Sequence, residues 1–130
     1  MAVDPKHLRK LTLEAIQRGK DKKKYDDKLA RDAEERHLRA QERRAHTIID
    51  GIPARAEKEA ENEKSHAIIM AVKHEDFIKP TYGNTESSSN LKDAAKMVWD
   101  YCVTADLKPT IEYWYSGDDL RSGYNIVIHW

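Results

Sequence analysis

Hydrophobic positions are spaced differently in the two halves of the chain, and this difference predicts an α+β protein with two parts. Over residues 5–65, apolar residues are sparse and recur at helical intervals among many charged residues. From residue 66 onward the charge density falls, and apolar residues gather in short runs or alternate with polar ones. We therefore expect a charged helical arm over 1–65 and a small head over 66–130.

The arm is predicted to contain two helices. Asp4 and Pro5 indicate a helix start, because Asp caps a helix N-terminus and Pro fits its first turn. The stretch Asp50-Gly51-Ile52-Pro53 predicts a break near 50–53, with Pro53 in the first turn of a second helix. Whether the two helices form a hairpin or continue as a rod stays open.

The apolar stripe of the arm contains few large residues, so the arm can bury little apolar surface by itself. Long helices that bury little surface of their own are stabilised by packing against another helix. We therefore expect the arm to drive self-association or to dock a partner protein. The residues expected at that contact are Leu8, Leu11, Tyr25, Leu29, Leu38, Ile48 and Ile49.

The head is predicted to follow the order β-α-β-β. Residues 67–72 (AIIMAV) favour a strand, although six residues of this kind also fit the end of a helix. Asn90 is the expected N-cap of a helix that starts near residue 91. A hairpin from Thr110 to Trp130 completes the head. The apolar face of the helix is expected to hold Leu91, Ala94, Ala95, Val98, Tyr101, Cys102 and Ala105.

Alternation along the hairpin assigns its side chains to two faces. The face expected to form the core under the helix consists of Ile111, Tyr113, Tyr115, Tyr124, Ile126, Ile128 and Trp130. The opposite face carries Trp114 and Val127 next to Glu112, Asn125 and His129. Two interpretations of this second face stay open: an exposed binding surface, or a face that the N-terminal helices cover.

Composition and sequence features argue against a disulfide-linked, secreted or membrane-spanning protein. The 23 Lys and Arg residues balance the 23 Asp and Glu residues. The single cysteine allows no internal disulfide, which is typical of a reducing compartment. The N-terminus lacks the apolar region of a secretory signal, and the longest apolar run is far shorter than a membrane span. We expect a cytoplasmic protein with no membrane association.

Candidate chemistry is scarce, so we expect no enzyme activity, no cofactor and no metal. His74-Glu75-Asp76 resembles part of a helical zinc motif, but that motif needs a second His where Ile78 stands. Cys102 falls on the apolar helix face, where a cysteine acts as a small apolar side chain. Glycine-rich phosphate loops and serine-nucleophile motifs are absent from the sequence.

Binding is therefore the predicted function, with two alternatives. The first is a protein-interaction module that presents Trp99, Trp114, Asp118, Asp119 and Arg121 on the head. A charged helical arm, a compact head and no catalytic signature resemble the small accessory proteins that many phages encode, which modulate a host or viral protein. The alternative is a nucleic-acid-binding protein that uses the basic residues Lys20, Lys22, Lys23 and Lys24.

Overall fold

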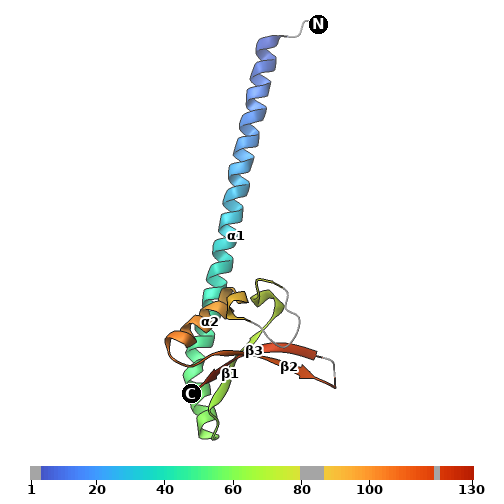
Figure 1. Ribbon diagram of the computed structural model, residues 1–130. Helices are drawn as coiled ribbons and strands as arrows, with labels where there is room; N and C mark the ends of the chain where they lie inside the picture. The colour runs from blue at the N-terminus through green and yellow to red at the C-terminus, as the bar shows by residue number, and fades with distance from the viewer. Residues whose placement is uncertain (1–3, 80–86, 119–120) are drawn as a thin grey trace. The chain divides into compact units, whose positions relative to one another are not determined.

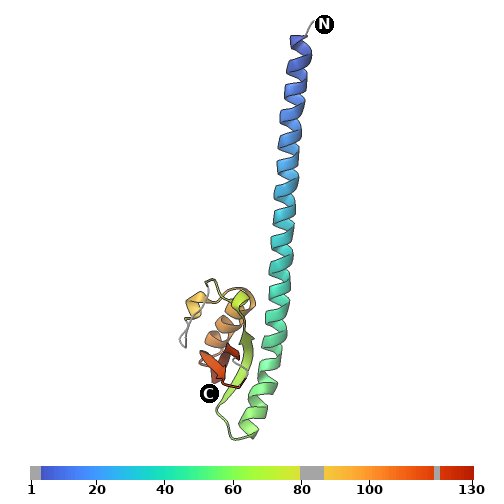
Figure 2. The same cartoon turned by 90° about the vertical axis from the view of Figure 1, so that its right-hand side faces the viewer.

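The structure is a computed structural model that describes residues 4–79, 87–118 and 121–130 (Figures 1 and 2). A long helix precedes a three-stranded antiparallel sheet and one shorter helix, which confirms the predicted α+β class. The chain divides into two compact units, Met1–Leu38 and Arg39–Trp130. The elements are α1 (Pro5–Glu61), β1 (His66–Val72), η1 (His74–Asp76), η2 (Ser88–Asn90), α2 (Asp93–Thr104), β2 (Thr110–Ser116) and β3 (Arg121–His129).

The predicted break near 50–53 is wrong, because α1 continues through Pro53. A proline inside a helix removes one backbone hydrogen bond and costs about 3 kcal/mol. Packing of α1 on both sides of the proline offsets this cost. Ala45 and Ile52 precede it and are buried in the core of the second unit, and Ala56 follows it and packs against that core. Pro53 itself is exposed, so its ring does not disturb this packing.

The sheet has the strand order β1-β3-β2, and both neighbouring pairs are antiparallel. The predicted strand over 67–72 is confirmed as β1. A β-bulge interrupts β1: Ile68 faces Val127 and Met70 faces Ile126, so Ile69 is an extra residue. Because of the bulge, the consecutive side chains of Ile69 and Met70 are both buried.

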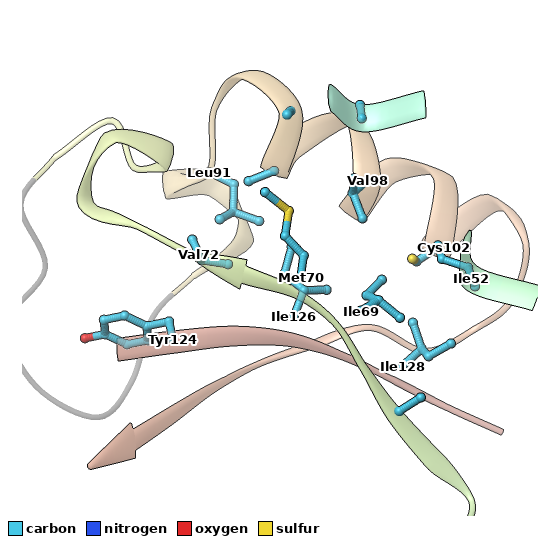
Figure 3. Packing of buried hydrophobic residues seen from close by; sticks show 14 of the residues in the cluster. Ile52, Ile69, Met70, Val72, Leu91, Val98, Cys102, Tyr124, Ile126 and Ile128 are labelled. Carbon is cyan, nitrogen blue, oxygen red and sulfur yellow. The ribbon is translucent and has the colours of Figure 1, made fainter. Parts of the chain in front are cut away.

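The core lies between one face of the sheet and α2 (Figure 3). Val98 and Cys102 of α2 point toward the sheet, where Ile69 and Ile128 lie opposite them. Most of the predicted apolar helix face is confirmed as buried, whereas Tyr101 and Ala105 are exposed. The buried members of that face are Leu91, Ala94, Ala95, Val98 and Cys102.

The hairpin follows the predicted alternation in its middle and departs from it at its ends. The predicted core residues of β3 are buried, and Ile111 and Tyr113 of β2 pack against them. Tyr115 and Trp130 were expected in the core, but they are 58 % and 44 % exposed, because Tyr115 lies one residue before the end of β2 and Trp130 lies beyond the end of β3. Val127 belongs to the opposite face and is nevertheless buried, because β3 is the central strand and Ile68 and Thr110 flank it.

Helix α2 starts later than predicted, and Asn90 does not cap it. Asn90 lies in η2, where its side chain accepts a hydrogen bond from the Lys79 N–H at 2.9 Å and donates one to the Lys79 carbonyl at 3.2 Å. The capping acceptor comes from α1 instead: Gln41 Oε1 accepts the backbone N–H of Ala94 at 3.2 Å.

The last turns of α1 belong to the second unit through one face, which we call the anchoring face. Its residues recur three or four positions apart, as one helix face requires. Ala45, Ile48 and Ile52 supply its apolar contacts with the core. Its polar contacts come from Gln41, Arg44 and Arg55.

Arg44 makes the most buried polar contact of the anchoring face. Its guanidinium donates to both carboxylate oxygens of Asp76, at 2.7 and 3.2 Å, and Asp76 is only 1 % exposed. The backbone N–H of Lys73 donates a third hydrogen bond to this carboxylate at 2.9 Å. Asp76 raises the pKa of Arg44 by hydrogen bonding and by charge, so the guanidinium stays protonated.

Replacing Arg44 by Met should destabilise the second unit by about 2–4 kcal/mol, because the buried Asp76 carboxylate loses its counter-ion. Arg43→Met is the matched control, since Arg43 is the exposed neighbour and should change the stability by less than about 0.5 kcal/mol. Urea unfolding followed by circular dichroism measures both. Equal losses in the two variants would contradict the assigned role of Arg44.

Candidate interaction surfaces

The N-terminal segment of α1, residues 5–38, has exposed apolar side chains along one face. Positions 8, 11, 15, 18, 22, 25 and 29 are separated by steps of three and four, so their side chains lie on one side of the helix. We call this face the arm stripe. Its large apolar members are between 45 % and 63 % exposed: Leu8, Leu11, Tyr25 and Leu29.

Not all of the residues predicted for self-association lie on the arm stripe. Leu38 is exposed but lies nine positions after Leu29, which places it on the other side of the helix. Ile48 and Ile49 are partly buried and pack against the core of the second unit. The side chains of Ile48 and Ile49 therefore contact residues of the same chain.

The basic residues predicted for nucleic-acid binding are all exposed on α1. Lys22, Lys23 and Lys24 are consecutive, so successive side chains point about 100° apart around the helix axis. They surround the helix rather than forming one flat patch. Lys22 lies on the arm stripe together with Arg18, whereas Lys20, Lys23 and Lys24 lie outside it.

The residues predicted for partner binding on the head differ in accessibility. Trp99 is half-buried and packs against the core, whereas Trp114 is 40 % exposed. Asp118 and Arg121 are exposed near the hairpin turn. Asp119 lies outside the described residues.

The side chain of Trp114 packs on the face of the sheet that is opposite to the core. Its indole lies over Gly123, its partner across the β2–β3 pair, where an added Cβ would come within 2.8 Å of the indole Nε1. Glycine at position 123 therefore gives the ring room to lie flat against the strand. Ile68, Ala71 and Glu112 on the same face are exposed, so this face fits the interpretation of an open surface.

A pocket of about 790 Å³ lies where β1 ends, beside η1 and the hairpin. Its aromatic wall is made by Phe77, Tyr113 and Tyr124, whose rings meet edge to face at centroid distances of 5.3 and 5.4 Å. Trp114 and the exposed residues Lys73, His74 and Glu75 also line the pocket. Such a pocket suits an apolar or aromatic group. It could not be predicted from the sequence, in which the aromatic residues that line it are far apart.

Within the described residues, no group of three or more His, Cys, Asp or Glu side chains could hold a metal ion. Asp76 of the His-Glu-Asp stretch is committed to its ion pair with Arg44. None of the described helices is both long and apolar enough to cross a lipid bilayer.

Comparison of the chain with known protein families, with characterised proteins and with solved structures finds no match.

Cys102 should be unreactive in the folded protein. Burial raises the pKa of its thiol from 9.0 to about 11, so at pH 8 the reactive thiolate is about a hundredfold scarcer than in the unfolded chain. Iodoacetamide labelling, followed by mass spectrometry with and without urea, tests this expectation. Labelling at similar rates in both conditions would show that the thiol is accessible.

The same pKa shift predicts a pH dependence of stability. Between about pH 9 and 11 the unfolded thiol loses its proton while the folded thiol keeps it. The folded state then binds more protons, so this contribution to stability is fully present below pH 9 and is lost as pH rises to 11. The free energy of unfolding should fall less over this range in Cys102→Ala than in the unaltered protein.

Proposed function

We propose that this protein is a non-enzymatic protein-interaction module that docks another protein through the arm stripe of α1. The observation that carries the proposal is the exposure of four large apolar side chains on one face of a helix. These side chains are about half exposed, so covering the rest of each contributes about 0.7–1.5 kcal/mol. The second unit, which contains α2 and the sheet, would hold the C-terminal part of that helix.

The partner should present an amphipathic helix with acidic residues at its centre. Arg18 and Lys22 interrupt the arm stripe between its two apolar pairs. Over residues 18–24 there are five basic residues and one acidic residue, a charge of +4. A facing helix needs apolar residues against Leu8 and Leu11, carboxylates against the cations, and apolar residues again against Tyr25 and Leu29.

A second copy of the chain fits the arm stripe less well. In a parallel pair in register, Arg18 would face Arg18 of the other copy, and Lys22 would face Lys22. Like charges at these positions disfavour the pair. If the chain is an accessory protein of the phage type, the acidic partner is a host or viral protein whose activity it modulates.

Paired substitutions test the arm stripe directly. Leu11→Gln with Leu29→Gln removes two stripe residues, whereas Leu13→Gln with Leu38→Gln removes two exposed leucines outside the stripe. Tagged forms of both double variants and of the unaltered protein are used for capture from native cells in the presence of nuclease. A partner bound by the unaltered protein should be at least about tenfold depleted only with the stripe variant.

Two outcomes would contradict the proposal. Equal retention of all partners by the two double variants would show that the arm stripe is not the contact. Loss of every partner with nuclease would favour the nucleic-acid alternative. In that case Lys20→Gln, Lys23→Gln and Lys24→Gln should together weaken binding to duplex DNA or RNA and reduce its salt dependence.

A further inference from the structure

Strand β2 forms an edge of the sheet that no other described strand covers. The order β1-β3-β2 leaves two edges, and β2 pairs only with β3 among the described residues. The other edge is protected, since Arg55 of α1 donates to the carbonyls of Ile68 and Ile69 in β1 at 3.2 and 3.3 Å. Within residues 4–79, 87–118 and 121–130, no strand pairs with residues 110–115 on the side away from β3, so another strand can add there.

The sequence of β2 has few of the features that normally block an edge. Thr110–Ser116 reads TIEYWYS, with no proline, no lysine and no bulge in its pairing with β3. Its only charged residue is Glu112. Trp114 and Tyr115 expose 40 % and 58 % of their surface, which is apolar area that an added strand would cover.

We propose that β2 pairs antiparallel with β2 of a second copy, so that two three-stranded sheets join into one of six strands. The two-fold axis passes through Tyr113, which faces Tyr113 of the other copy. Glu112 then faces Trp114, Ile111 faces Tyr115, and Thr110 faces Ser116. The seven-residue strand pairs along its whole length in this register: hydroxyl residues face each other at the ends, Ile111 faces Tyr115, and Glu112 faces the indole of Trp114.

Charge and length select this register over its neighbours. Shifting the axis to Glu112 would place the two carboxylates directly opposite each other, and like charges at that position destabilise a strand pair. If the axis passed through Trp114, only residues 112–116 of each β2 would face the other copy. With the axis at Tyr113, all seven residues of β2 are paired. Both shifts lose cross-strand contacts.

The facing residues Glu112 and Trp114 provide a test that does not depend on the arm stripe. Trp114→Lys and Trp114→Glu both remove the indole, but the first places an ammonium against Glu112 of the other copy and the second a carboxylate. Each dimer contains two such contacts. Sedimentation equilibrium of the full chain should give a dissociation constant at least about tenfold higher for Trp114→Glu than for Trp114→Lys.

Exchanging the charges provides the control. The double variant Glu112→Lys with Trp114→Glu restores opposite charges at both contacts and should recover the dissociation constant of Trp114→Lys. Circular dichroism checks that all three variants are folded. In the unaltered protein, amide hydrogen exchange over residues 110–116 should slow as the protein concentration rises.

Equal dissociation constants for the two single variants, with no recovery in the double variant, would overturn the proposed pairing. Exchange of residues 110–116 that does not change with concentration would overturn it as well. Neither outcome affects the arm stripe, which the leucine variants test separately.

Discussion

The carboxylate of Asp76 joins α1 to the turn that follows β1, and the packing of the second unit depends on this link. It is almost fully buried and accepts hydrogen bonds from the guanidinium of Arg44 and from the backbone of Lys73. A buried carboxylate is tolerated only when it is paired, so α1 and the turn after β1 must lie together for this site to form. The anchoring face extends this link: Gln41 caps α2, Ile52 reaches the core, and Arg55 covers the edge of β1.

One helix therefore has two different surfaces. The anchoring face is stabilised by contacts within the chain, and these also hold the helix together at Pro53. The arm stripe exposes Leu8, Leu11, Tyr25 and Leu29 and has basic residues at its centre. Isolated helices gain little stability from propensity alone, so the arm stripe is the part of α1 with most to gain from a partner. Pairing of β2 would bring two such helices into one assembly and increase their avidity.

Much of the fold could be predicted from periodicity. The alternation in 110–130, the helical spacing after Leu91 and the β-branched run 67–72 each predicted the element that forms. The errors arose where distant residues decide local structure. Pro53 is a strong local signal for a helix break, but packing of Ala45 and Ile52 outweighs it.

The candidate sites were harder to predict for the same reason. The exposed leucines of the arm stripe were visible in the sequence, although Ile48 and Ile49 could not be separated from them without the fold. Arg44 and Asp76 are 32 positions apart, and no spacing rule connects them. The pocket was missed because Phe77 and Tyr124 meet only once β1 and β3 have paired. The open edge of β2 likewise follows from strand order, which the sequence did not show.

Amide hydrogen exchange across α1 distinguishes its two parts, residues 39–61 in the second unit and residues 5–38 in the first. Amides of 39–61 should exchange as slowly as those of β1, β3 and α2, because they open only when the whole unit unfolds. Amides of 5–38 should exchange orders of magnitude faster in the protein alone. Fast exchange that begins at residues 50–53, or uniform slow exchange over 5–61 at high dilution, would contradict this division of α1.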